Sequence, residues 1–269
     1  MGRGSSVGFS ERREPVSPDT TGDLGTVLGV WGHPDDEAYL SAGLMMQALA
    51  NGHRVVCVTA TRGEAGFPAD DPRSIAERQA VRETELAACL GVLGVTDHRW
   101  LGYGDGRCAD VPDEEAVAVL TEVMADVRPD TVLTFGPDGG TGHPDHVAAC
   151  RWSTLAFERA ALPGTRLLYS TKSREWSDRV YVGVDRSTIM MVEGLEPEAV
   201  DPAELAVWFT CDDPLLARKV HALRAQASQV EPFVQAIGED AYTELVREEF
   251  YRAPRAGDEE MLRRFSAPR

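Results

Sequence analysis

The sequence predicts an α/β protein with a mostly parallel sheet and helices on both faces of that sheet. Three observations favour this fold class. Short apolar runs alternate with segments of helical periodicity, as in chains built from βαβ units. The run at 24–31 is continuously apolar, which is typical of a parallel strand buried on both faces. The 269 residues are enough to bury the core of one large domain.

The strands are predicted by short apolar runs that are bounded by turn residues. We expect them at 24–31, 53–60, 98–101, 131–135, 166–170 and 179–184. In such sheets, ligands bind outside the carboxyl ends of the strands.

The helices are predicted by apolar residues at helical spacing and by capping residues. We expect one before Gly52 and others over 74–94, 113–127, about 146–160, 213–230 and 239–253. Ser74 and Glu77 have the spacing of a capping box, and Pro214 lies near the start of the fifth helix. This order of elements predicts a Rossmann-like sheet, with the active site at the carboxyl ends of the strands.

The two ends of the chain differ in composition from the segment between them. Residues 1–23 are rich in glycine, serine, proline and charge, and predict a disordered leader. Residues 24–252 are expected to form a single domain. Residues 253–269 predict a loose tail.

Composition excludes several classes of partner. The net charge of −17 argues against nucleic acid and anionic membrane surfaces, because binding phosphates needs surplus lysine and arginine. No apolar run has the length of a membrane span, and the N-terminus has no signal-peptide pattern, so we expect a cytoplasmic protein. The five cysteines are widely spaced and form no CxxC pair, which argues against a thiolate zinc site. The sequence does not decide whether the chain forms a homo-oligomer.

Two related motifs follow predicted strands. GHPDDE begins at Gly32, and GHPDH begins at Gly142. Each proline favours an extended conformation for the preceding histidine and can start the next helix. Side chains on such stiff turns are suited to binding a metal.

The residue types in these motifs predict a catalytic metal centre. Two imidazoles and one carboxylate, from His33, His146 and Asp36, resemble the ligand sets of catalytic zinc, which leave a position open for water. Asp35 is then left over as the general base. His143 can stabilise an oxyanion or protonate a leaving amine, with Asp145 orienting it.

On these motifs the sequence resembles the LmbE-like (PIG-L) superfamily of zinc-dependent N-deacetylases, over about residues 25–230. The resemblance implies that His33, Asp36 and His146 bind one Zn²⁺ per chain. It also implies that Asp35 is the base. It further implies that His143 polarises the amide or assists departure of the amine.

Two further residues are expected to bind substrate. The resemblance places Arg82 where the family has a substrate-contacting arginine, although the sequence by itself favours a solvated helix residue. Asp105, in the segment LGYGDG, is expected to bind sugar hydroxyls, and a turn aspartate is the alternative. Gln226 stands where the family often has a histidine, so its role stays open.

We therefore expect a zinc-dependent hydrolase that removes an N-acyl group, most simply N-acetyl, from a small amino sugar or glycoside in thiol-cofactor or natural-product metabolism. One alternative is an amidase that cleaves a larger mycothiol-like conjugate. The other is a non-hydrolytic metal- or nucleotide-binding module. The loop GPDGGTG at 136–142 superficially favours the module, but it lacks the lysine of a phosphate-binding loop.

Overall fold

The computed structural model describes residues 22–183 and 185–266. Within them, seven strands form one sheet. The strands are β1 (Val27–Trp31), β2 (Val55–Thr61), β3 (Asp97–Tyr103), β4 (Thr131–Thr134), β5 (Arg166–Ser170), β6 (Val207–Thr210) and β7 (Glu248–Arg252). All but the last two residues of the predicted leader, 1–23, lie outside the described residues.

Helices connect and cover these strands. They are α1 (Asp36–Ala50), α2 (Ile75–Leu93), α3 (Asp113–Val127), α4 (Pro144–Ala160), α5 (Arg174–Val180), α6 (Asp213–Arg224), α7 (Ala227–Ile237), α8 (Glu239–Leu245) and α9 (Asp258–Ser266). The predicted capping box is present at the start of α2, where the Ser74 side chain accepts from the Glu77 backbone N–H. Gly94 ends α2 in the left-handed conformation, as expected of a helix C-terminus.

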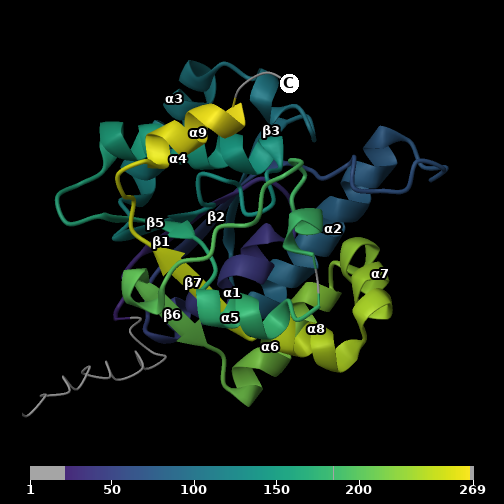
Figure 1. Cartoon of the computed structure of the whole chain (residues 1–269). Coiled ribbons are helices and arrows are strands. Elements are labelled where there is room, and N and C mark those ends of the chain that lie inside the picture. Colours follow the sequence, from purple (N-terminus) through teal and green to yellow (C-terminus); the bar gives the residue numbers. More distant parts are fainter. Residues whose placement is uncertain (1–21, 184, 267–269) are drawn as a thin grey trace, which may run out of the picture.

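The sheet has the order β3-β2-β1-β4-β5-β7-β6. The strands from β3 to β5 in this order are parallel, whereas β7 pairs antiparallel with both β5 and β6. Helices α3, α4 and α9 cover one face, and α1, α2 and α6 cover the other (Figure 1). The predicted α/β class, with a mostly parallel sheet and helices on both faces, is therefore confirmed.

The antiparallel edge of the sheet differs from the prediction. The segment 239–253, predicted as one helix, forms α8 and then strand β7. The segment 213–230 is two helices, which are separated near Gln226. The strand predicted at 179–184 is wrong, because its described residues complete α5 and then form a turn. Strand β6 was not predicted.

The predicted loose tail, 253–269, is corrected by the structure over its described residues. Helix α9 packs on α4, and Leu262 is buried in the main core. Arg252, only 1% exposed, donates two hydrogen bonds of 2.8 Å to Asp258 at the start of α9. The same guanidinium donates to Glu198, so one buried arginine ties α9 to the loop before β6. The partners of Arg252 cannot be identified from the local sequence, which is why the sequence predicts a loose tail for residues 253–269.

A fully buried ion pair joins the antiparallel edge to α1. Lys219 Nζ lies 2.6 Å from Glu249 Oε1, and both side chains are 0% exposed. The Glu249 carboxylate also accepts from the backbone N–H groups of Gly43 and Leu44 in α1. Lys219 donates to the Tyr39 carbonyl of the same helix. These bonds fix α1, whose first turn holds Asp36 and Glu37 of the HPDDE motif.

Replacing Lys219 with Met is expected to lower the free energy of unfolding by about 3–5 kcal/mol, because it leaves the Glu249 charge buried without its partner. Urea unfolding followed by circular dichroism measures this loss. The control is Arg159→Met, which breaks the exposed ion pair with Glu114 and should cost no more than about 1 kcal/mol. Equal midpoints for the two variants would contradict the assigned role of the buried pair.

All five cysteines are buried and form no disulfide. Burial raises the pKa of each thiol above its ordinary value. They therefore act as small apolar core residues, as the sequence predicts. Among the helices of the described residues, none combines the length and apolar character that spanning a membrane requires.

Candidate active site

The two histidine motifs meet at the point where the strand order reverses. β1 pairs with β2 on one side and with β4 on the other, in parallel register from Val27 opposite Thr131 to Gly29 opposite Leu133. The chain leaves β1 into residues 32–35 and leaves β4 into residues 135–143, so both loops lie at the same carboxyl edge. Ligands of such sheets bind at this reversal point.

Tight backbone packing brings the loops together. A Cβ atom on Gly32 would lie 2.9 Å from His146 Cδ2, so glycine is needed for the close approach of the second motif. Gly139 has a φ of +66°, and a Cβ there would lie 3.0 Å from His146 Cβ. These two glycines therefore set the position of the His146 ring.

Three potential ligand atoms converge at this edge. His33 Nδ1 lies 3.0 Å from His146 Nε2. Asp36 lies 3.6 Å from His33 Nδ1 through Oδ2, and 3.5 Å from His146 Nε2 through Oδ1. Ligands about 2.0–2.1 Å from a tetrahedral zinc are roughly 3.3–3.4 Å apart, so this spacing fits one shared metal ion.

The outer nitrogen of each histidine is already hydrogen-bonded. His146 Nδ1 lies 3.0 Å from the Gly139 carbonyl oxygen. His33 Nε2 lies 3.0 Å from Asp105 and 3.2 Å from Asp145. A proton on each outer nitrogen leaves lone pairs on the two inner nitrogens, which face one another across 3.0 Å. Only a cation between them makes this contact favourable, which is the pattern of metal-binding histidines.

The electrostatics of the cluster also favour a cation. Burial opposes protonation of His33, but hydrogen bonds from Asp105, Asp145 and Asp36 raise its pKa well above the ordinary value. Burial lowers the pKa of His146 to about 4 despite the charge of Asp36. Burial works against ionisation of Asp36, yet His146 and His33 outweigh it and lower its pKa to about 2. The cluster therefore places ionised carboxylates around the two imidazole rings, and these surroundings attract a cation.

Two other groupings have atoms close enough to share a metal ion. Nitrogen atoms of His33, His143 and His146 lie within 4.8 Å of one another, and so do ligand atoms of His33, Asp105 and Asp145. In the first, the Nδ1 atom of His143 already accepts from the Asp145 backbone N–H, so only its Nε2 atom is free to ligate. In the second, one nitrogen of His33 faces two carboxylates. Asp36 approaches His33 and His146 through different oxygens, and a metal between the two rings would leave the outer hydrogen bonds of both histidines intact.

Asp35 occupies a strained position beside the cluster. Its φ of +106° lies in the region that side chains rarely adopt. Arg82 donates to the Pro34 carbonyl and, over 3.2 Å, to Asp35 Oδ2. Glu37 accepts the Asp35 backbone N–H at 3.0 Å. Burial raises the pKa of Asp35 to about 7, against the opposing charge of Arg82. The carboxylate is thus held in place with a proton affinity suited to a base.

Arg82 is neither a solvated helix residue nor a freely exposed ligand. Its side chain is 2% exposed and holds the turn that carries Asp35. Its Nε and Nη1 atoms are buried without an acceptor among the described residues. Arg82 also lines the cavity over the cluster.

Gln226 lies behind the site. Its Nε2 atom donates to Glu37 Oε1 over 2.8 Å, and the residue is fully buried. Burial and the charge of Asp35 raise the pKa of Glu37 to about 8, so this carboxyl group is largely protonated at neutral pH. Gln226 therefore supports the residue that binds the Asp35 backbone.

His143 caps helix α4 and turns its other nitrogen towards the cavity. Its Nδ1 atom accepts from the Asp145 backbone N–H, which leaves a proton on Nε2. Burial lowers the pKa of His143, so the neutral ring presents an N–H donor. The predicted orientation by the Asp145 carboxylate is corrected: that carboxylate accepts from the backbone of Gly106 and Cys108 and contacts His33.

Asp105 lies at the site, but its carboxylate is already engaged. It contacts His33 Nε2 and accepts the Ala65 backbone N–H at 2.7 Å. Its side chain is 6% exposed. The structure thus places Asp105 beside His33 at the wall of the cavity, where it orients the imidazole ring.

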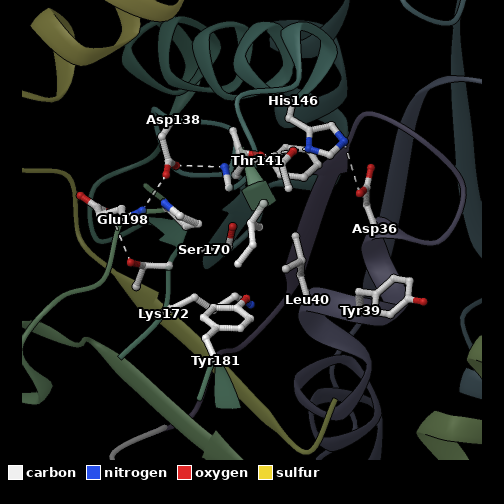
Figure 2. A pocket seen from close by; sticks show the side chains of 16 residues that line it. Asp36, Tyr39, Leu40, Asp138, Thr141, His146, Ser170, Lys172, Tyr181 and Glu198 are labelled. Carbon is white, nitrogen blue, oxygen red and sulfur yellow. Dashed lines mark hydrogen bonds and ion pairs between the residues drawn. The ribbon is translucent and has the colours of Figure 1, made fainter. Parts of the chain in front are cut away.

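Two cavities flank the cluster. One, of about 530 Å³, lies over His33, Asp35 and His143 and is also lined by Arg82. The other, of about 190 Å³, extends from Asp36 and His146 towards Lys172 and Glu198 (Figure 2). A substrate that spans the cluster would therefore place one of its parts in each cavity.

Sequence reasoning missed most of the second cavity. Its lining includes Thr141, Ser170, Lys172, Tyr181 and Glu198. These residues come from loops that are far apart in the chain and carry no shared motif. One signal was present: Lys172 lies two residues after the predicted strand at 166–170, at the same edge as the histidine motifs.

Comparisons with known proteins agree with this site. Residues 28–157 match the family model described as PIG-L, GlcNAc-PI de-N-acetylase. The chain is 33% identical over 232 residues to the 1D-myo-inositol 2-acetamido-2-deoxy-alpha-D-glucopyranoside deacetylase of Acidothermus cellulolyticus, covering 76% of this chain and 80% of that protein. It is 32% identical to the enzyme of the same name from Streptomyces avermitilis, covering 83% of this chain and 92% of that protein.

A solved structure agrees on the fold. The model resembles N,N'-diacetylchitobiose deacetylase from Pyrococcus horikoshii with a TM-score of 0.58 and 22% identity, covering 86% of this chain and 84% of that one. These relatives give no support to a non-hydrolytic binding module. The sequence match over most of a relative's length, together with the motifs and their geometry, shows that the chain belongs to the PIG-L family and is an N-deacetylase.

Proposed function

We propose that the chain is a zinc-dependent hydrolase that removes the N-acetyl group of a small amino-sugar glycoside, with one zinc ion held by His33, Asp36 and His146. The observation that carries this proposal is the approach of His33 Nδ1 to within 3.0 Å of His146 Nε2, with Asp36 oxygens 3.5–3.6 Å away. Carboxylate and imidazole ligands suit zinc.

The substrate class follows from the relatives and from the larger cavity. The relatives above 30% identity are named as deacetylases of an N-acetylglucosamine glycoside of inositol. Arg82 lines this cavity, and its guanidinium would face the sugar. Asp105 would contribute indirectly, by orienting His33.

Different residues would act on the attacking water and on the amide group. A zinc ion at this position supplies Lewis acidity, which makes water a stronger nucleophile and the carbonyl a better electrophile. Asp35 accepts the proton of the attacking water. The Nε2–H of His143 donates to the oxygen on which negative charge develops, and can then protonate the leaving amine.

The proposal is tested by metal analysis and amine release. The purified protein is freed of metal with a chelator and reloaded with zinc in increments. It is then incubated with the inositol glycoside of N-acetylglucosamine, and the free amine is quantified. Activity that rises to a plateau at one zinc per chain is expected. Zinc binding without amine release from any N-acetylated sugar would contradict the proposal.

Replacing His143 with Ala is expected to lower kcat by about 10²–10³-fold and to leave the zinc content unchanged, because the residue donates to the developing oxyanion. Zinc content and turnover are measured on the same preparation. A His143→Gln variant keeps a donor and should recover part of the loss. A kcat within a few-fold of wild type for the Ala variant would remove His143 from the mechanism.

A further inference from the structure

The chain uses lysine at only two of its 269 positions, against 25 arginines. Neither lysine is an exposed surface residue. Lys219 is fully buried and paired with Glu249 at 2.6 Å. Lys172 lies two residues after β5, at the carboxyl edge of the sheet that carries the active site. Lysine concentrates its charge on one compact ammonium group, whereas arginine spreads it over a plane.

The ammonium group of Lys172 forms no ion pair within the described residues. No carboxylate among them lies within 4.0 Å of its Nζ atom, although the protein carries a large excess of acid. The centroid of the Trp176 ring is 5.0 Å from Nζ. Burial and the nearby charge of Lys219 lower the pKa of Lys172 to about 8, so it remains mainly charged at neutral pH. A partly buried cation without a counterion is costly unless a ligand supplies the negative charge.

Lys172 also faces the route that leads away from the catalytic cluster. It lines the 190 Å³ cavity that begins at Asp36 and His146 (Figure 2). It lines a second, largely apolar cavity of about 640 Å³ as well. Tyr39 and Tyr181 border both cavities, so the two cavities adjoin at Lys172. A group that extends from the catalytic cluster into the smaller cavity is therefore close to the ammonium.

The cavities on the two sides of the cluster are both mostly apolar, and they differ in their charged residues. The cavity over the cluster is lined by Arg82, Asp35 and Asp105. The charged residues of the other cavity are Lys172 and the carboxylates of Asp36, Asp138 and Glu198, of which Glu198 is already paired with Arg252. At about 190 Å³ this cavity is far larger than one methyl group requires. An N-acetyl group would leave most of this space to another part of the substrate.

We propose that Lys172 binds an anionic group of the substrate, a carboxylate or a phosphate, that is carried on a short apolar arm beyond the amide. This inference rests on the proposed hydrolase function and specifies its substrate class. The anion belongs either to the acyl group or to the group attached to the sugar. Both sources share the same chemistry at Lys172, and the substrates below distinguish them.

Matched substrates test the acyl source. Glucosamine is acylated with succinyl, which ends in a carboxylate, or with 4-methylpentanoyl, which has the same shape and no charge. We expect the wild-type kcat/KM to favour the succinyl substrate and Lys172→Met to reverse the preference, changing the ratio by about 10–100-fold, as for a charge-assisted hydrogen bond.

A second pair tests the group attached to the sugar. It compares N-acetylglucosamine 1-phosphate with methyl N-acetylglucosaminide, in wild type and in Lys172→Met. The control variant is Arg159→Met, an exposed residue of α4, which should leave every ratio unchanged. The proposal is overturned if Lys172→Met changes kcat/KM by the same factor for the charged and the neutral member of both pairs.

A binding measurement separates this proposal from the hydrolase function. Reductive methylation of the zinc-loaded protein with ¹³C-formaldehyde labels Lys172, while Lys219 is 0% exposed. The resonance missing in Lys172→Met assigns the signal. Succinate should shift it, as should inorganic phosphate, whereas 4-methylpentanamide, which carries no charge, should shift it much less. Equal shifts from succinate and 4-methylpentanamide, or none from succinate and phosphate, would refute the anion site. A selective shift without any amide hydrolysis would refute the proposed function and retain the anion site.

Discussion

Replacing Asp36 with Asn is expected to weaken zinc binding by more than about 10²-fold, because even residues that only support a metal ligand cost 10–100-fold when removed. Asn keeps the size of Asp36 and can still accept the His33 backbone N–H, which Asp36 Oδ2 now accepts at 2.7 Å. Its neutral amide no longer offsets the charge of the metal. Titration with a competing zinc indicator measures the affinity, and turnover at limiting zinc should fall in parallel.

The matched control is Asp126→Asn. Asp126 is 60% exposed and pairs with Arg99, remote from the histidine motifs in the sequence. It should keep wild-type zinc affinity and turnover. If Asp36→Asn binds zinc as tightly as wild type does, the ligand set with Asp36 is wrong, and the group with His143 becomes the stronger candidate.

Replacing Asp35 with Asn is expected to lower kcat by about 10²–10⁴-fold, the range for loss of a general base, while the zinc content stays that of wild type. The positive φ of Asp35 is tolerated by Asn at least as well as by Asp, so the turn should persist. The side-chain oxygen of Asn can still accept from Arg82. Zinc content together with single-turnover rates separates this effect from loss of metal.

The pH profile provides a second readout for the same variant. The base acts when ionised, so wild-type kcat/KM should fall as the pH drops through the pKa of Asp35. Burial raises that pKa to about 7, and a neighbouring dication pulls it lower, which places the acidic limb at or below pH 7. The limb should be absent from Asp35→Asn. An unchanged limb in the variant would assign the base to another group.

The parallel half of the fold was predictable because its signals are local. β1 is an unbroken apolar run, and the ends of α2 carry their own capping residues, Ser74 and Gly94. Both histidine motifs lie in short loops directly after strands. Their convergence then follows from the general rule for open parallel sheets.

The antiparallel edge was not predictable, because its strand is charged and nevertheless buried. β7 reads EEFYR, and all five residues are buried. Glu249 pairs with Lys219, Glu248 with Arg179, and Arg252 with Asp258. A lone segment with these charges is typical of a solvated helix. Only the three-dimensional partners make a buried strand favourable.

The predicted site was correct in its location and incomplete in its supporting contacts. The sequence indicates that His33, Asp36 and His146 act together, but not that Arg82 holds the Asp35 turn or that the Asp145 carboxylate contacts His33. Those contacts depend on side-chain direction and on loop lengths. Lys172 lacks a motif altogether, since its significance lies in the absence of a nearby carboxylate.

The burial of every native thiol makes the protein convenient for spectroscopy. Maleimide reagents attack thiolates, and the five cysteines are both inaccessible and held in the thiol form by their surroundings. Val182 is 77% exposed and follows Tyr181, which borders the Lys172 cavities. A fluorophore attached to a cysteine introduced there could follow ligand entry in real time, without a cysteine-free background.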